Sequence, residues 1–134
     1  MQQGDFGPIL VEQLPAKREA LRIAVVTETY PPEVNGVALT AARFVEGLCA
    51  RGHRVLLARP AQRGESAGSE DGALRQVLVR GAPIPRYPDL RMGLPAKRAL
   101  TQLWSLHRPD LVHIVTEGPL GWSALQAAAK LKLP

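Results

Sequence analysis

This 134-residue sequence has almost no cysteine, few aromatic residues and no long apolar run. Its single cysteine, Cys49, excludes a disulfide within the chain and is typical of a reducing compartment. We expect Cys49 to be a small, buried or half-buried residue and not a catalytic thiol, because no base is obvious near it. Aromatic residues make up only 4% of the chain, so its core has to be built from Leu, Val, Ile and Ala. No apolar run approaches the roughly 20 residues of a membrane-spanning helix.

Several motifs that would assign a function directly are also missing. Neither GxGxxG nor GxxxxGK[ST] occurs, so a classical dinucleotide site or P-loop is not supported. His and Cys residues do not recur at the spacing of metal ligands, and we expect no metal site. The first residues lack the order of charged and apolar regions found in a signal peptide, which favours a cytoplasmic protein.

Positive charge is in excess, with a formal net charge of +5 and a pI of about 10. Such a balance is compatible with a nucleic acid, an anionic membrane or an anionic ligand, and also with an ordinary solvated surface. The basic residues do not alternate with aromatic ones, so a platform for stacking bases is not supported and we expect no nucleic-acid partner.

The most informative stretch runs from Leu21 to Leu48. Residues 21–27 are rich in β-branched residues, which predicts a strand buried on both faces. A loop with two prolines follows, and Asn35-Gly36 then supplies a cap for a helix that ends near Ala50. Its predicted apolar face is formed by Val37, Ala41, Phe44, Val45 and Leu48.

The rest of the chain alternates between strand and helix patterns. Further strands are predicted at 54–58, 76–80 and 111–115, and further helices at 94–108 and 120–131. Residues 61–73 are expected to form a surface loop and the proline-rich residues 81–95 an extended connection. This order predicts an α/β fold with a doubly wound parallel sheet over residues 21–134, preceded by an irregular lead-in at 1–20.

Two loops are expected to emerge at the carboxyl ends of the central strands, where ligands bind in such sheets. The first contains Glu28 and the Asn35-Gly36 pair, and its glycine either admits an anion at the helix start or only begins the helix. The second contains Glu117, a carboxylate just past a buried strand. Glu28 has the same placement but can instead satisfy nearby N–H groups of the loop. His113, inside a predicted strand, is read as a core histidine.

Two strings of this sequence resemble a known family. RIAVVTETYPPEVNGVALTAARFVEGLCARGHRVLLARP looks like the opening of retaining GT-B glycosyltransferases of the GT4 type, and RPDLVHIVTEGPLGWSALQAAAKLKLP resembles the later PDxVHxxxxGxxG segment of that family. The two strings lie in the family's order, and the resemblance extends over residues 21–134. It is strongest to the branch that acts on diacylglycerol, phosphatidylinositol or mannosyl acceptors.

The resemblance implies an enzyme with two Rossmann-like lobes, of which this chain would form part of the acceptor-side, N-terminal lobe. The other lobe would hold a UDP- or GDP-linked sugar as co-substrate, without a metal or a further cofactor. In the family, the first loop approaches the donor diphosphate, which implies this role for Asn35 and Gly36, with Glu28 facing the same cleft. The later loop lines the reaction centre, which implies a catalytic role for Thr116 and Glu117, with Gly118 beside the donor.

The sequence departs from the family in three respects. Asn35-Gly36 stands where many members have two glycines, and Val115 and Thr116 stand where many have a histidine, so His113 does not inherit that role. The second lobe is absent, and we therefore expect the 134-residue chain alone to be inactive or nearly so.

Two other functions remain open from the residues alone. One is a non-catalytic α/β domain that binds an anionic small molecule at Asn35-Gly36. The other is a peripheral module on an anionic membrane, at the inner face of the cell membrane, using Lys97 and Arg98 of the basic helix at 94–108. Packing of this helix onto the sheet explains its apolar face equally well.

Overall fold

The computed structural model describes residues 7–8 and 19–134. The expected lead-in at 1–20 therefore lies almost entirely outside the described residues.

The fold is built on a five-stranded sheet with the order β3-β4-β2-β1-β7. Its strands are β1 (Arg22–Val26), β2 (Arg54–Pro60), β3 (Ser69–Asp71), β4 (Leu74–Val79) and β7 (Leu111–Ile114). β1, β2, β4 and β7 are parallel, and only β3 pairs in the antiparallel direction. The fold is thus the expected α/β arrangement with a parallel sheet.

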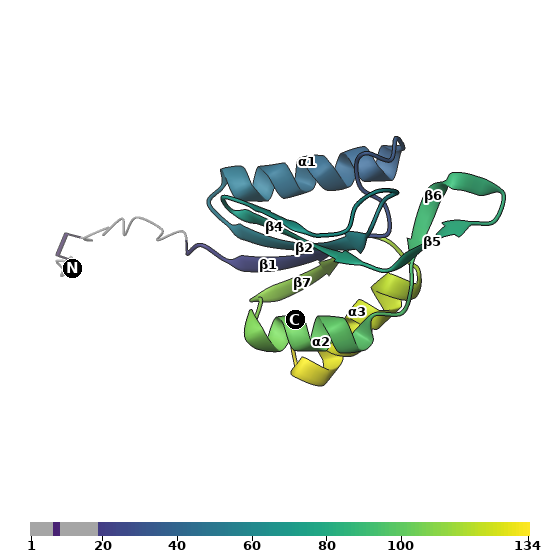
Figure 1. Cartoon of the computed structure of the whole chain (residues 1–134). Coiled ribbons are helices and arrows are strands. Elements are labelled where there is room, and N and C mark those ends of the chain that lie inside the picture. The colour runs from purple at the N-terminus through teal and green to yellow at the C-terminus, as the bar shows by residue number, and fades with distance from the viewer. Residues whose placement is uncertain (1–6, 9–18) are drawn as a thin grey trace, which may run out of the picture.

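Helices cover both faces of this sheet (Figure 1). α1 (Gly36–Ala50) lies on one face, and α2 (Lys97–Leu106) and α3 (Pro119–Leu131) lie on the other. Successive residues of each central strand point to opposite faces. Val25 of β1 therefore packs on the α1 side, whereas Ala24 and Val26 pack against α2 and α3. Each face has its own apolar core.

Local sequence signals position α1 correctly. Asn35 is its N-cap, and the Asn35 side chain accepts a hydrogen bond from the Ala38 N–H at 2.8 Å. Gly52 follows the helix at φ +88°, the left-handed region that favours glycine. The predicted buried face is partly wrong, because Val37 is 46% and Phe44 39% exposed. The helix is rotated so that its small residues meet the sheet; the buried positions are Ala38, Ala41 and Val45.

Two segments that were expected to be irregular contain strands. The predicted loop at 61–73 includes β3, which pairs with β4 along the edge of the sheet. The predicted connection at 81–95 contains a separate antiparallel hairpin of β5 (Gly81–Ile84) and β6 (Tyr87–Gly93). Pro85 and Arg86 form its turn, and Arg86 has φ +71°. Prolines are tolerated because a two-stranded ribbon leaves one side of each strand free of ladder hydrogen bonds.

Two single-residue expectations have different outcomes. Cys49 is half-buried as expected, and burial raises the pKa of its thiol. The prediction of a core histidine at His113 is wrong, because this side chain is exposed. Its ring lies against that of Phe44 with centroids 4.7 Å apart, and β7 is the edge strand of the sheet.

Within the described part of the chain, no helix is both long and apolar enough to span a bilayer.

The two tryptophans provide a direct test of the core. Trp104 of α2 is 1% exposed and belongs to the core under α2 and α3, whereas Trp122 of α3 is 62% exposed. We expect Trp104→Ala to lower the free energy of unfolding by about 3–5 kcal/mol, because it leaves a large cavity. Trp122→Ala, the matched control, should change it by less than about 1 kcal/mol. Urea denaturation followed by circular dichroism measures both, and equal losses would contradict this packing.

Candidate functional site

The candidate site lies where β1 and β7 end side by side. Val26 pairs with Ile114, and the Val115 N–H continues the ladder by donating to the Val26 carbonyl at 2.8 Å. The chain leaves β1 toward α1 on one face and leaves β7 toward α3 on the other. The main-chain paths therefore diverge and open a crevice at the carboxyl ends of the strands. The two loops singled out from the sequence meet at this crevice.

A cavity of about 320 Å³ occupies the crevice. One wall comes from the loop after β1, a second from the loop between β7 and α3, and a third from the β5–β6 hairpin, which stands at this end of the sheet in Figure 1. The polar lining residues are Glu28, Thr29, Glu33, Asn35, Arg91, Thr116 and Glu117. The apolar or glycine lining residues are Val37, Ile84, Leu90, Met92, Gly118 and Pro119.

Glu28 holds these walls together. Its buried carboxylate accepts hydrogen bonds from the Gly93 N–H in β6 and from the Leu120 N–H at the start of α3, the latter at 2.8 Å. The Gly121 N–H adds a longer contact of 3.4 Å. The carboxylate thus satisfies free donors of α3 and places negative charge at the positive end of that helix. Glu28 lines the cavity, but its oxygen atoms point into the protein main chain.

Glycine is required around this carboxylate. A Cβ atom on Gly118, which has φ +150°, would lie 2.4 Å from the Glu28 carboxylate. A Cβ on Gly93 would meet Glu28 at 2.9 Å and Leu120 at 2.5 Å, and one on Gly121 would meet the Thr116 carbonyl at 2.4 Å. Gly118 is therefore needed for the local packing, whatever it does toward a ligand.

A second polar network fixes the loop after β1. The Asn35 amide donates to the Thr29 hydroxyl at 2.7 Å, and that hydroxyl donates to Glu33 at 2.6 Å. Glu33 is buried and also accepts from the Gln62 side chain at 3.0 Å and from the Arg91 N–H at 3.1 Å. Asn35 is consequently held from both ends, as the cap of α1 and as a member of this network.

Gly36 begins α1 between two residues that line the cavity. A Cβ atom on Gly36 would meet nothing within 4 Å, so this position opens onto free space. Among residues 19–134 no acceptor pairs with the first N–H groups of the helix, those of Gly36 and Val37. These groups and the positive end of the helix dipole are accessible to an anion.

Thr116 and Glu117 play different structural parts. The Thr116 hydroxyl accepts a hydrogen bond from the Glu28 N–H at 2.7 Å and so joins the two loops. Glu117 is exposed and lines both this cavity and a neighbouring one of about 530 Å³, which also contacts Trp122 and Leu125 of α3. Glu117 is therefore the carboxylate of this site that is accessible to a ligand.

Two contributors to the site escaped sequence reasoning. Glu33 follows two prolines in the first loop, and its partners Gln62 and Arg91 lie 29 and 58 residues further along the chain. No local pattern signals such contacts. The apolar wall from the hairpin was missed because the hairpin itself was read as a connection.

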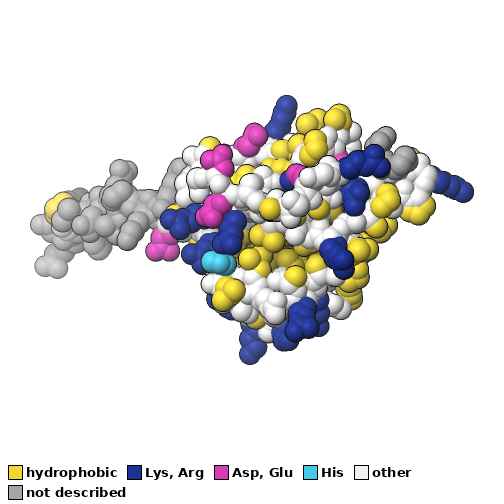
Figure 2. Space-filling model, viewed as in Figure 1, with side chains coloured by type: hydrophobic (Ala, Val, Ile, Leu, Met, Phe, Trp, Pro, Cys, Tyr) yellow, Lys and Arg dark blue, Asp and Glu magenta, His cyan; other side chains and the backbone are white. Residues whose placement is uncertain are grey.

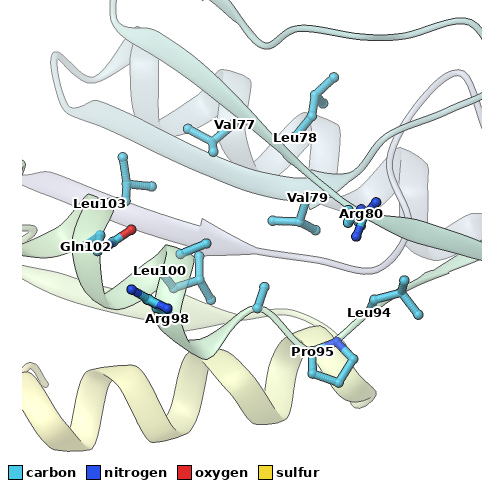
Figure 3. Close-up of a pocket in the computed structure, with 12 residues that line it drawn as sticks. Val77, Leu78, Val79, Arg80, Leu94, Pro95, Arg98, Leu100, Gln102 and Leu103 are labelled. Atoms are coloured by element: carbon cyan, nitrogen blue, oxygen red, sulfur yellow. The ribbon is translucent and has the colours of Figure 1, made fainter.

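The predicted basic helix frames another cavity of about 530 Å³ between β4 and α2 (Figure 3). Val77 and Val79 of β4 and Leu100 and Leu103 of α2 extend into this space. Arg80 and Arg98 lie beside it, so an apolar groove here has a basic margin.

Charge near the end of β2 is balanced internally. The buried Arg59 guanidinium contacts Glu65 at 2.8 Å and lies 5.8 Å from the centre of the Tyr30 ring. The hydrogen bond from Arg59 lowers the pKa of Glu65 to about 2. Burial, aided by the Glu46 charge, raises the pKa of the Tyr30 hydroxyl. Across the described residues, no three His, Cys, Asp or Glu side chains are grouped closely enough to hold a metal ion.

Comparison with known proteins places this geometry in context. The chain is 33% identical over 120 residues to a GDP-mannose-dependent alpha-mannosyltransferase of Mycobacterium tuberculosis (strain CDC 1551 / Oshkosh), an alignment that covers 85% of this chain and 30% of that protein. It is 31% identical over 116 residues to an alpha-monoglucosyldiacylglycerol synthase of Acholeplasma laidlawii, covering 85% of this chain and 28% of that protein. The chain thus spans about 30% of the length of the curated relatives it matches.

The sequence model of Glycosyltransferase Family 4 matches residues 34–134. This range includes α1, the whole of the loop that carries Thr116, Glu117 and Gly118, and all the parallel strands except β1. The matched residues and the parallel sheet agree with a Rossmann-like lobe of the GT-B fold, and the chain belongs to glycosyltransferase family 4.

Proposed function

We propose that this chain is the acceptor-side part of a retaining glycosyltransferase, which transfers a hexosyl group from a UDP- or GDP-linked sugar to an acceptor. The observation that carries the proposal is the cavity between the loops after β1 and β7, in a chain of this family. A mannosyltransferase that depends on GDP-mannose is among its relatives, which supports a nucleotide-sugar donor.

The start of α1 is the part of this site suited to the donor diphosphate. Its free Gly36 and Val37 N–H groups and the dipole of a 15-residue helix favour an anion there. Asn35 is fixed by Ala38 and Thr29, so the loop is preorganised. Stabilising the departing diphosphate in this way lowers the barrier to transfer.

Glu117 and Thr116 form the opposite wall and face the reaction centre in this proposal. The exposed Glu117 carboxylate is available to orient an acceptor hydroxyl or to stabilise positive charge that develops on the sugar. Glu28 acts as a positioning residue, because its contacts with Leu120 and Gly93 hold the second loop and the hairpin in place. Gly118 lets the main chain pass close to that carboxylate and to the donor side of the cavity.

The acceptor is proposed to be a membrane lipid or a mannosyl glycan. The hairpin gives the cavity apolar lining through Ile84, Leu90 and Met92, and Val37 adds to it from α1. A cavity with such a wall beside hydroxyl and carboxylate groups suits a sugar or polyol head carried by an apolar tail. The similarity to a monoglucosyldiacylglycerol synthase supports the same class.

Transfer also needs a second wall that closes over the donor and excludes water. We therefore expect the 134-residue chain alone to release no measurable nucleoside diphosphate from GDP-mannose or UDP-glucose in the presence of a lipid acceptor. Where the reading frame continues beyond Pro134, its complete product should catalyse the transfer and retain the anomeric configuration, which NMR of the product reveals. Transfer by the chain alone would contradict the need for a second wall, and an inactive complete product would contradict the proposed function.

Gly36 separates a binding role from a structural one. Gly36→Ala creates no clash, so the variant should be at least as stable as the parent chain, yet its methyl group occupies the space where a phosphate would lie. We expect nucleotide-sugar turnover by the complete product to fall about a hundredfold, because the methyl group keeps the phosphate away from the Gly36 and Val37 N–H groups.

Gly47→Ala in the last turn of the same helix is the matched control, and its Cβ would lie 3.3 Å from the end of the flexible Arg51 side chain, which can move aside. It should raise stability by about 1 kcal/mol and leave turnover unchanged. Equal turnover in both variants would remove the donor-phosphate role of Gly36.

Glu117→Gln keeps the size of the side chain and removes its charge. Because the Glu117 side chain is exposed, we expect no change in the temperature of thermal unfolding. We expect kcat to fall about a hundredfold while the KM for the donor stays constant. Glu46→Gln, on the exposed side of α1, serves as the control for loss of one carboxylate. A kcat close to that of the parent enzyme would exclude a catalytic role for Glu117.

A peripheral position at the inner face of the cell membrane, in the cytoplasm, completes the proposal. Lys97 and Arg98 are exposed at the start of α2, next to the groove that Arg80 and Leu94 also line. Vesicles with 30% phosphatidylglycerol should carry the parent chain to the top of a sucrose gradient, whereas the Lys97→Glu/Arg98→Glu variant should remain at the bottom.

The control Arg43→Glu/Arg63→Glu makes the same change in net charge elsewhere on the surface. It should still float, and a loss of flotation equal to that of the Lys97/Arg98 variant would mean that the membrane senses only net charge.

A non-catalytic domain that binds an anionic small molecule at Asn35-Gly36 is the alternative function, and it requires nucleotide binding without transfer by the complete product.

A further inference from the structure

The amino ends of the parallel strands carry an unusual concentration of positive charge. Arg22 begins β1, Arg54 begins β2, Arg75 lies near the start of β4, and Arg108 follows α2. We name these four residues the basal arginine cluster. Figure 2 shows Lys and Arg side chains near a histidine at this end of the molecule, away from the hairpin, with some Asp or Glu side chains beside them. The cluster is therefore at the opposite end of the sheet from the site described above.

Strand register forces three of these side chains onto one face. Arg22 pairs with Arg54, and Leu56, two residues further along β2, pairs with Arg75. Because side chains alternate along strands, the three arginines share the face that α2 and α3 cover. Like charges in paired positions repel, so this arrangement costs folding free energy unless an anion compensates for it.

The protein itself supplies only part of the compensation, because Glu70 of β3 pairs with Arg75 in the antiparallel ladder and Arg22 and Arg54 have no such partner in theirs. Among the side chains that the structure describes, the Arg59–Glu65 contact is the ion pair observed, and it lies at the other end of β2. Asp110 accepts from the main-chain N–H of Arg22 at 2.7 Å and not from a guanidinium group.

Main-chain and imidazole acceptors instead orient the cluster. Arg108 donates to the Leu131 carbonyl at 3.0 Å, and Arg22 donates to the Arg108 carbonyl at 3.4 Å. Arg75 contacts the His107 ring nitrogen at 3.1 Å, which holds its guanidinium in a fixed direction. Each of these contacts uses one of the five N–H donors of an arginine and leaves others free.

The arginines converge on two adjoining cavities. One, of about 350 Å³, is lined by Arg22, Arg54, Arg75 and His107, with Glu70 at its margin. The other, of about 470 Å³, is lined by Arg22, Arg54 and Arg108, with Asp110. Arg22 and Arg54 belong to both, so an anion with two charged groups can span them. Three arginines against one carboxylate in each cavity give a positive field with several planar, multidentate donors.

We propose that the basal arginine cluster is a binding site for a phosphate-bearing anion, separate from the glycosyltransferase site. The ligand chemistry is that of two linked or neighbouring phosphate groups, either on a soluble compound or on a lipid headgroup. Arg22 and Arg54 contact both groups, Arg75 binds the one beside His107, and Arg108 binds the other.

Isothermal titration calorimetry with inorganic pyrophosphate, in buffer matched with sodium chloride for ionic strength, tests the soluble source. We expect binding by the parent chain and a Kd about tenfold weaker for Arg54→Gln, the effect of losing one charge-assisted hydrogen bond. Arg54 is exposed, so this variant should unfold at the temperature of the parent chain. Arg54→Lys, which retains the charge, should recover part of the affinity.

Flotation with vesicles that contain phosphatidic acid in phosphatidylcholine tests the lipid source with the same variants. Arg43→Gln, an exposed arginine on α1, is the control for charge and should match the parent chain in both assays. The site is supported if, in either assay, the parent chain binds, Arg54→Gln binds more weakly and Arg43→Gln binds as the parent chain does. The assay in which this occurs identifies the source of the ligand. Absence of binding in both assays, or equal loss in the two variants, overturns it.

Discussion

The carboxylate of Glu28 is the interaction on which the arrangement of this lobe depends. It lies just past the central strand β1 and accepts hydrogen bonds from β6 and from the first turn of α3. Those segments are distant in sequence, at 65 and 92 residues from Glu28. Removing the carboxylate would leave buried N–H groups without partners, which costs about 1–3 kcal/mol for each. One side chain thus joins the loop after β1, the hairpin and the second wall of the site.

A division of labour follows from this geometry. The buried acids Glu28 and Glu33 use their oxygen atoms on protein N–H, hydroxyl and amide donors, so they build the site. The exposed Glu117 and the free N–H groups at the start of α1 remain available to substrates. This distinction is invisible in sequence, where Glu28 and Glu117 have equivalent positions after parallel strands. Only the contacts made across the sheet separate the supporting carboxylate from the accessible one.

The sequence predicted the parts of the fold that depend on local patterns. The four parallel strands and three helices lie within about three residues of their expected limits, because apolar periodicity and capping residues such as Asn35 act locally. The hairpin was missed since prolines normally interrupt strands, and β3 was missed since Ser69–Asp71 is short, polar and exposed. The exposed position of His113 follows from the place of β7 at the edge of the sheet, and the order of the strands in a sheet is not a local property of the sequence. The role of Glu33 in the site depends on contacts with residues far along the chain, and no short stretch of sequence contains both partners.

The crowding around Glu28 has a consequence for how this lobe can change over time. A side chain on Gly118 would collide with that carboxylate, one on Gly93 would collide with Leu120 and with Glu28, and Gly121 is confined by the Thr116 carbonyl. A smaller residue at 28 would remove the clash at Gly118, but the φ of +150° there would still disfavour a side chain, and the clash of Gly93 with Leu120 would remain. Replacing the acid alone therefore leaves both glycines constrained. The acid, Leu120 and the neighbouring glycines are thus packed as one unit, so a change at one of these positions has to be accommodated at several of the others.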